Sequence, residues 1–373
     1  MTEPIRNLSV SGFRAFTDLS VGPFGHVNLI TGKNNAGKSS LLEAIRILVT
    51  EGSPKTFHDI LNYREESELR PASETERLYS PNDFSPFCSL FSGFPNLAGC
   101  AQGFTISAHN EQTSALTVRV GWFVDKFDPE RRSVSFERVQ LDMFGDMDGF
   151  PALDIESSGR QRTVPISRIR SRARILEELG ERFAMPCVPL DPFSSRSTSQ
   201  LAAFWDKIAL TDSEKEVVSA LKIISDDIEA VSMIGGNEDG PRRRTAIVRS
   251  SRYPSPIPLR SFGDGVNRLF GIILSLCNAK GGVLLVDEIE NGLHHSVLTD
   301  IWKVIFRLAR DLQVQVFATS HSWDCIKAFQ MAAAESPENG VLVRLTRKGE
   351  KIIPTVFGEE ELYIATRDQI ELR

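Results

Sequence analysis

The clearest chemical feature of the sequence is a glycine-rich loop near its beginning. Residues 32–39 read GKNNAGKS, which fits the pattern G-x-x-x-x-G-K-[S/T], and we call them the phosphate loop. Glycines let such a loop curl so that several backbone N–H groups converge on phosphate oxygens. Lys38 would bring a mobile positive charge to the β- and γ-phosphates, and the Ser39 hydroxyl is an oxygen ligand suited to Mg²⁺. The loop therefore predicts a site for a nucleoside triphosphate with Mg²⁺.

The residues on either side of the phosphate loop supply the context that this motif requires. The apolar run HVNLI (26–30) precedes it, and SSLLEAIRILV (39–49) places its apolar side chains on one helical face. A helix that starts at the loop directs its positive N-terminal end at a bound anion. The alternative is a glycine-rich turn that only begins a structural helix. The residues expected to contact the nucleotide are Gly32, Asn34, Asn35, Ala36, Gly37, Lys38, Ser39 and Ser40.

A second set of candidate residues ends an apolar run late in the chain. The run 283–286 (VLLV) is followed by Asp287 and Glu288. In a parallel sheet, the carboxyl ends of the strands line the ligand crevice. Asp287 would then hold Mg²⁺, directly or through water, and Glu288 would polarise the attacking water. The alternative is a buried strand that ends in polar residues for structural reasons, and the phosphate loop makes this the weaker interpretation.

A long insertion separates Lys38 from Asp287, whereas small GTPase-like folds place the two motifs much closer together. An insertion of this kind resembles the ABC, SMC and RecF-type ATPases. Residues 259–265 (LRSFGDG) resemble the ABC signature loop, and we use that name for them. In that loop a serine and glycines open a helix and bind the γ-phosphate held by a second subunit. The resemblance therefore gives Ser261 and Gly263 a nucleotide-binding role across a dimer.

The match to the signature loop is imperfect. Asp264 also fits, but Phe262 replaces a glycine of the commonest form, and Arg268 lies one place beyond the usual arginine. A Ser/Asp N-cap on an ordinary helix is the alternative. Residues 290–294 (ENGLH) follow the acidic pair, where a D-loop would lie. His321, in the run ATSHS, lies where a switch histidine would act in catalysis, although a lone histidine at a strand end is usually structural.

Together these motifs resemble one subset of ABC-type ATPases, the OLD-type (overcoming lysogenization defect) and related RecF-like proteins. The resemblance rests on GFRAF, GKNNAGKSSLLEAI, SFGDGVNRLF, LLVDEIENGLHH and ATSHS. It implies ATP as the nucleotide and a homodimer, or a higher oligomer, formed head to tail through the ATPase heads. Many relatives act in bacterial defence against phage or in DNA transactions. Many OLD-type proteins also carry a Toprim nuclease domain, for which residues 341–373 leave no room, so we expect any nuclease or toxin effector to be a separate protein.

The elements that must position these residues indicate an α/β fold. We expect an ABC-type P-loop NTPase with a mostly parallel sheet, an antiparallel β subdomain and a short helical arm. Residues 1–160 would form an N-terminal ATPase lobe with the β subdomain, 161–250 a connecting and helical region, and 251–373 a C-terminal ATPase lobe. Predicted strands are 5–10, 26–31, 104–108, 115–124, 132–144, 281–288, 314–320 and 341–345, and predicted helices are 39–49, 200–234, 266–279, 296–310 and 324–334. Residues 166–180 are interpreted as a strand entering a helix.

The composition of the chain limits the classes of protein to which it can belong. The net charge is −6 and the sequence pI about 5.7, so any DNA or RNA binding must be local. Five cysteines without a Cys-x-x-Cys pair, together with an N-terminus unlike a signal peptide, favour a reduced, cytoplasmic protein. No apolar stretch is long enough for a transmembrane helix, so no membrane partner is expected. Two arginine groups, within 160–174 and 242–252, would either bind nucleic-acid phosphates or form a solvated, acid-paired face.

Two classes of function fit these motifs. The first is an ATPase engine, in which ATP closes a dimer and hydrolysis opens it, so that the cycle gates a nucleic acid or an effector. The second is a nucleotide-bound scaffold that holds a partner nuclease or toxin with little turnover. Glu288 favours the first, because a pure scaffold could dispense with it. A transporter subunit fits less well. No glutamine switch can be assigned to Gln102 or Gln112, and Arg14 is a candidate for approaching the nucleotide.

Overall fold

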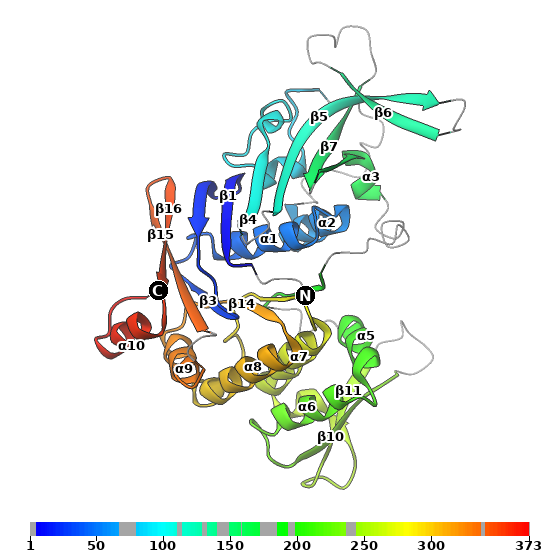
Figure 1. The fold of residues 1–373 in the computed structure, drawn as a ribbon. Helices are drawn as coiled ribbons and strands as arrows, with labels where there is room; N and C mark the ends of the chain where they lie inside the picture. The colour runs from blue at the N-terminus through cyan, green and yellow to red at the C-terminus, as the bar shows by residue number, and fades with distance from the viewer. Residues whose placement is uncertain are drawn as a thin grey trace.

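The candidate motifs lie along a parallel sheet assembled from distant parts of the chain. The structure is a computed structural model that describes residues 5–66, 80–109, 114–128, 133–139, 149–157, 159–171, 185–192, 198–235, 244–336 and 340–372. The sheet has the strand order β16-β15-β3-β14-β13-β9, and every neighbouring pair is parallel except β15 with β16 (Figure 1). The strands are β3 (Val27–Thr31), β9 (Cys187–Leu190), β13 (Val283–Val286), β14 (Gln315–Thr319), β15 (Gly340–Lys348) and β16 (Lys351–Phe357).

The central strands of this sheet are buried on both faces, because a hydrophobic core lies on either side. In β13, Leu284 and Val286 belong to one core, whereas Val283 and Leu285 belong to the other. Uninterrupted apolar runs are what strands covered on both faces require. Figure 1 shows α1 on one side of the sheet and α7, α8 and α9 on the other. The helices are α1 (Lys38–Val49), α7 (Asp264–Asn278), α8 (Leu298–Leu312), α9 (Trp323–Ala333) and α10 (Glu359–Arg367).

An antiparallel sheet covers α1 from the far side. Its strand order is β2-β1-β4-β5-β7-β8, with β6 paired to β5. The strands are β1 (Asn7–Phe13), β2 (Phe16–Val21), β4 (Phe104–His109), β5 (Ser114–Asp128), β6 (Ser133–Val139), β7 (Phe150–Ser157) and β8 (Arg160–Pro165). The helices beside it are α2 (Pro54–Tyr63) and α3 (Ile166–Ser171), with 3₁₀ helices η3 (Pro86–Leu90) and η4 (Gly99–Gln102). The predicted mostly parallel sheet and antiparallel β subdomain are therefore confirmed.

The insertion before the signature loop corrects one prediction. Helices α5 (Thr198–Ile208) and α6 (Asp212–Leu221) agree with the helix expected over 200–234, but the end of that range is a strand. β10 (Ile228–Ile234) pairs antiparallel with β11 (Thr245–Ser250), which in turn pairs with β12 (Ile257–Pro258). A register shift between Ile228 and Ala230 brings Ile228 and Val231 to the same buried side. Two apolar residues three positions apart are also the pattern of a helical face, which explains why this strand was predicted as part of a helix.

The other element predictions are mostly confirmed, with shifts at their ends. Residues 166–180 were interpreted as a strand entering a helix, but the strand, β8, ends at Pro165 and helix α3 already begins at Ile166. Residues 172–180 lie outside the described residues. Residues 140–144 of the predicted strand 132–144 also lie outside them. Strands β2, β7, β8, β9, β11, β12 and β16 and helix α10 were not predicted. None of the helices in the described ranges has both the length and the apolar character to cross a membrane.

Candidate functional site

The phosphate loop connects β3 to α1 and has the backbone that only glycine tolerates at two positions. Gly32 has φ +142°, and a Cβ there would lie 2.4 Å from the carbonyl oxygen of Leu345 on β15. Gly37 has φ +90° and caps α1 without a side-chain hydrogen bond. The first turn of α1 contains no acidic residue. Its N–H groups and its positive end are therefore available to an anion.

The eight residues predicted to contact a nucleotide differ in exposure. Asn34 and Asn35 are exposed, and Asn35 adopts a left-handed backbone with φ +64°. Lys38 and Ser39 are half-buried, as is Gly37. Ala36 and Ser40 are buried, so these two positions offer a ligand their backbone N–H groups rather than their side chains. The loop can thus surround an anion mainly with main-chain donors, as the glycine-rich pattern predicts.

The Lys38 ammonium folds back over the loop. Its Nζ donates to the carbonyl oxygens of Gly32 at 2.7 Å and Lys33 at 3.2 Å. Burial lowers the pKa of Lys38, while the negative charges of Asp287, Glu288 and Glu290 act in the opposite direction. The lysine is therefore near enough to all three carboxylates to sense their charge. The structure brings the phosphate loop and the acidic strand end into one site.

Ser39 and Asp287 join the two halves of this site directly. Ser39 Oγ donates to Asp287 Oδ2 at 2.8 Å, and Thr319 Oγ1 at the end of β14 donates to Asp287 Oδ1. A hydroxyl and a carboxylate side by side are the oxygen donors that Mg²⁺ prefers at nucleotide sites, where phosphates and water complete its shell. The donor set present therefore fits this ion.

Glu288 follows in a strained backbone conformation. Its φ is +48°, a region that residues other than glycine seldom adopt. Its N–H donates to Thr319 Oγ1 at 2.8 Å, and its carbonyl oxygen accepts from the N–H of Asn291 at 3.0 Å. Such strain persists only where surrounding contacts hold it, and it clusters at functional sites. The half-buried Glu288 carboxylate is thus carried on a fixed turn at the edge of the sheet.

His321 lies beside the acidic turn, one strand away. Glu290 Oε1 accepts from Ser320 Oγ at 2.9 Å and from the His321 N–H at 3.0 Å. The Nδ1 of His321 lies 3.3 Å from the same oxygen, while 57% of the His321 side chain is exposed. Glu290 therefore fixes the loop that carries His321 and leaves part of the imidazole accessible.

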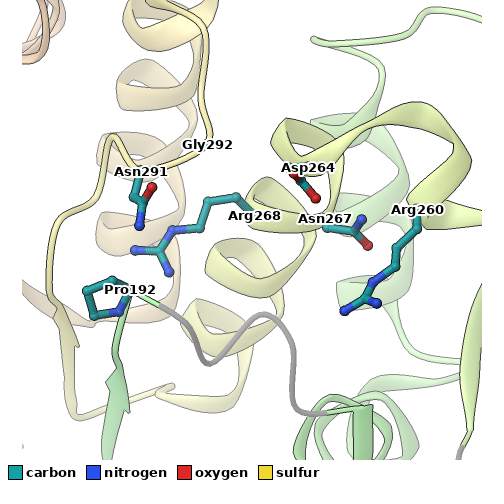
Figure 2. Close-up of a pocket in the computed structure, with 7 residues that line it drawn as sticks. All are labelled: Pro192, Arg260, Asp264, Asn267, Arg268, Asn291 and Gly292. Carbon is teal, nitrogen blue, oxygen red and sulfur yellow. The ribbon is translucent and has the colours of Figure 1, made fainter.

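Ser261 and Gly263 are not joined to the phosphate loop of their own chain by any hydrogen bond that the described residues make. Ser261 lies in the 3₁₀ helix η7 (Leu259–Phe262) and is exposed. Gly263 has φ +98°, begins α7 and faces open space, because a Cβ there would meet nothing within 4 Å. Beside this turn is a hollow of about 380 Å³ lined by Arg260, Asp264, Asn267, Arg268, Asn291, Gly292 and Pro192 (Figure 2).

Several residues near the site were not assigned there from the sequence. Asp191 directly follows β9, which pairs with β13 so that Leu190 lies opposite Val286. Asp191 thus follows its strand beside Asp287. The four residues of β9, CVPL, form too short an apolar run for a strand to be predicted from the sequence. Tyr63 ends α2, and burial together with the charges of Asp191, Asp287 and Glu288 raises its pKa to about 12. Only the folded sheet reveals that these residues are neighbours.

Arg14, a candidate from the sequence for approaching the nucleotide, makes ion pairs with carboxylates of its own lobe. Its Nε lies 2.6 Å from Glu43 Oε2, and its NH1 lies 2.9 Å from Glu66 Oε1. The side chain is buried in this ion-pair network. Gln102 lies at the end of η4, and Gln112 lies outside the described residues, so no glutamine is assigned to the site.

Comparison with known proteins agrees with this geometry. A family described as "AAA domain, putative AbiEii toxin, Type IV TA system" matches residues 102–324, and one described as "AAA domain" matches residues 7–84. An ATP/GTP phosphatase of Helicobacter pylori is 21% identical over 385 residues, which cover 98% of this chain and 99% of that protein. The DNA replication and repair protein RecF of Idiomarina loihiensis is 48% identical over 44 residues, 12% of each chain.

A solved SMC head shows the same fold over nearly the whole chain. That structure, an SMC head bound to the C-winged helix domain of ScpA, matches with a TM-score of 0.53 at 12% identity. The match covers 96% of this chain and 99% of the SMC chain. The predicted ABC-type fold is thus confirmed, and the first family match extends over more than half of the sequence. The chain belongs to the AAA-domain family described as "putative AbiEii toxin, Type IV TA system", a family of P-loop ATPases, and its fold is similar to that of an SMC head.

Proposed function

We propose that the chain binds Mg-ATP at the phosphate loop and Ser40, and that Glu288 polarises the water that attacks the γ-phosphate. The observation that carries this proposal is the 2.8 Å hydrogen bond between Ser39 and Asp287. It joins the start of α1, directly after the phosphate loop, to the residue that follows β13, which is the arrangement that a triphosphate with its metal requires. The strained turn at Glu288, next to this bond, supports the hydrolytic role.

The roles of the individual groups follow from their positions. Lys38 and the N–H groups at the start of α1 bind the phosphates. Ser39 and Asp287 hold Mg²⁺, which when bound neutralises charge on the β- and γ-phosphates. Glu290 holds the loop that bears His321 and leaves the imidazole partly exposed, and we propose that this imidazole contacts the γ-phosphate. We propose ATP as the nucleotide because the chain belongs to an AAA-domain family.

The cross-subunit role of the signature loop is a further part of the proposal. Ser261 is exposed, Gly263 faces open space, and both belong to a turn that opens α7. This turn suits a phosphate held by another subunit, because it offers main-chain donors without a side chain in front of them. We infer that ATP closes a head-to-tail dimer in which Ser261 and Gly263 of each chain complete the site of the other.

The dimer cycle is proposed to regulate a separate effector, such as a nuclease or a toxin, in bacterial defence against phage. The family description, which names a toxin and a toxin–antitoxin system, supports this assignment. A nucleic-acid transaction is less favoured, because the described arginines of the second group are paired with acids. Arg244, Arg249 and Arg252 pair with Asp206, Glu229 and Asp227, respectively.

The test is steady-state Mg-ATP hydrolysis as a function of protein concentration, for wild type and Glu288→Gln, with and without DNA. We expect a specific activity that rises with concentration and falls by about 10²- to 10⁴-fold in Glu288→Gln, as for loss of a general base. Light scattering after gel filtration should show a dimer that ATP traps in Glu288→Gln. Lys38→Ala, the matched control, should neither bind ATP nor form that dimer.

Two outcomes would overturn parts of this proposal. Full turnover by Glu288→Gln would remove Glu288 from the mechanism, and unchanged ATP affinity in Lys38→Ala would remove the phosphate loop. A negligible rate in every condition, combined with tight ATP binding, would favour the nucleotide-bound scaffold instead. Stimulation by DNA would favour a nucleic-acid transaction over a protein effector.

A further inference from the structure

The side chain of Arg268 is a buried cation whose hydrogen bonds, among the residues that the structure describes, all go to main-chain carbonyl oxygens. Although charged, it is only 2% exposed. Its NH1 donates to the carbonyl oxygen of Asp191 at 2.9 Å, and its NH2 donates to those of Asp287 at 2.9 Å and Glu288 at 3.0 Å. The guanidinium thus binds the main chain at the ends of two neighbouring strands, β9 and β13. Its planar fork of donors suits this task, which a lysine ammonium performs less well.

Burying a guanidinium carries a large desolvation cost unless nearby negative charge offsets it. Burial lowers the pKa of Arg268, whereas the carboxylates of Asp191, Glu290, Asp287 and Glu288 act to raise it. The same four carboxylates surround the edge of the sheet where phosphates are proposed to bind. Arg268 is therefore the buried counter-charge of an acidic cluster, and its hydrogen bonds go to the main chain that carries these carboxylates.

Glu288 is the residue on which these contacts converge. Its left-handed backbone, with φ +48°, is held at both ends by side chains from other elements. Thr319 Oγ1 accepts from its N–H, and Arg268 donates to its carbonyl oxygen. A left-handed conformation of a residue other than glycine costs about 1–3 kcal/mol and must be stabilised by its surroundings. Without Arg268, one of these two side-chain contacts is lost.

Arg268 also connects this turn to the signature loop. It lies one helical turn after Asp264, the first residue of α7, whose preceding residues form that loop. Figure 2 shows its side chain extending from α7 toward Asn291 and Pro192, at the wall of the hollow beside the signature loop. A displacement of the first turn of α7 would therefore move the group that holds Glu288.

We propose that Arg268 is a positioning residue for hydrolysis, which holds the backbone of Glu288 in the geometry that aims its carboxylate at the attacking water. This inference rests on the proposed function of Glu288. Because Arg268 donates to main-chain carbonyl oxygens and acts in this proposal only through Glu288, its loss should lower kcat and leave ATP affinity unchanged. A misplacement of a catalytic group by about 1 Å costs on the order of 100-fold in rate.

Two variants of Arg268 test the proposal. Arg268→Met keeps most of the side-chain volume without the charge, and Arg268→Ala leaves a space beside the solvent-open hollow. In Arg268→Met we expect kcat to fall about 100-fold while the Kd for ATP stays within about threefold, since only the placement of Glu288 changes. In Arg268→Ala, guanidinium ion at tens of millimolar should restore part of the lost rate, with sodium chloride at equal ionic strength as the control. Arg310→Met, on an exposed arginine of α8, should behave as wild type.

A second measurement does not depend on turnover. Amide hydrogen exchange should be faster in a peptide spanning 285–293 in Arg268→Met, because the turn at Glu288 loses one of its anchors. Turnover within about threefold of wild type in Arg268→Met would overturn the proposal, as would equal losses of ATP binding and rate without rescue by guanidinium. Failure of the proposed function is seen separately, as absence of hydrolysis by the wild type. The exchange measurement would then still decide whether Arg268 holds the turn.

Discussion

Ser39 and Asp287 lie 248 positions apart in the sequence and are joined by a hydrogen bond of 2.8 Å from Oγ to Oδ2. The bond holds a hydroxyl and a carboxylate oxygen side by side at the start of α1. Such a pair would supply two oxygen ligands to Mg²⁺, an ion that would neutralise phosphate charge at this site. The relationship makes a direct prediction about the metal dependence of nucleotide binding.

Replacing Ser39 by alanine should reduce the Mg²⁺-dependent part of ATP affinity. Wild type should bind ATP more tightly in MgCl₂ than in EDTA, and this difference should be smaller in Ser39→Ala, because one of the two protein ligands of the metal is missing. Titration calorimetry under the two conditions measures this difference. Ser39→Thr is the matched control, since it keeps the hydroxyl. A Mg²⁺ effect in Ser39→Ala as large as in wild type would show that Ser39 is not a ligand.

Gly37→Ala should weaken both folding and nucleotide binding. A Cβ at Gly37 would lie 2.9 Å from the Phe16 ring and 3.0 Å from Ile352 Cδ1, and the φ of +90° is unfavourable for alanine. We expect a loss of about 1–3 kcal/mol in the free energy of unfolding, from strain and crowding, measured by denaturant titration. The matched control is Gly93→Ala, which has φ +81° but open space around its Cβ position, so it adds backbone strain alone. Equal losses in the two variants would contradict the packing argument.

The elements predicted correctly are those in which the expected chemistry and the local structure lie on one short segment. The phosphate loop carries its own strand, turn and helix within 26–49, and the run 283–288 carries a buried strand with its terminal carboxylates. The largely apolar runs of β3, β13 and β14 indicated a sheet covered on both faces, and in the structure every residue of these strands is buried. Patterns of this kind need no knowledge of the rest of the chain.

Features that depend on two distant segments could not be predicted in the same way. The strand β10 reads as helix, because a register shift puts Ile228 and Val231 on one side, and its partner β11 follows a turn-rich break. Thr319 shows only as the last residue of an apolar run, although it contacts both Asp287 and Glu288. Arg268 was noticed only as a departure from the signature pattern. Their roles appear once β9, β13 and β14 are adjacent.

ATP affinity should fall at alkaline pH earlier than an ordinary lysine would allow. Burial lowers the pKa of Lys38, and binding of phosphate needs its charged form, so affinity should decrease as the pH rises through that lowered pKa. For the unliganded protein, the free energy of unfolding changes with pH in the opposite direction to the ATP affinity. The folded state binds fewer protons at Lys38 than the unfolded state, so this group's contribution to stability increases with pH over the same range.

This pH dependence is measured as the Kd for ATP between about pH 7 and pH 10, below the range in which arginine loses its charge. Lys38→Arg is the control, because its guanidinium remains charged throughout. We expect weaker binding in Lys38→Arg, since the longer planar group fits the loop less well, but little change of affinity with pH. A pH profile equally steep in Lys38→Arg and wild type would assign the titration to another group.

Arg14→Met should destabilise the protein without changing ATP affinity. Glu43 on α1 is buried and pairs with Arg14 and Arg64, each at 2.6 Å. Removing Arg14 leaves this carboxylate with Arg64 as its one counter-charge. Breaking a buried ion pair in this way costs about 3 kcal/mol of the free energy of unfolding, and the remaining Arg64 keeps the cost from being larger. Denaturant unfolding measures the loss, and ATP titration tests whether the nucleotide site is intact. A large fall in ATP affinity at unchanged stability would return Arg14 to the nucleotide site.

The loss of stability in Arg14→Met should also depend on pH. Burial raises the pKa of Glu43, while Arg14 and Arg64 lower it, so removing Arg14 raises that pKa further. A carboxyl group whose folded pKa is raised costs stability as the pH rises from its unfolded to its folded pKa, and the cost disappears once the group is protonated. The difference in melting temperature between Arg14→Met and wild type should therefore shrink as the pH is lowered from about 7 to about 5, within the range of raised carboxyl pKa values. Arg14→Met combined with Glu43→Gln, which cannot ionise, should show no such pH dependence, and a difference that grew on acidification would contradict the ion-pair explanation.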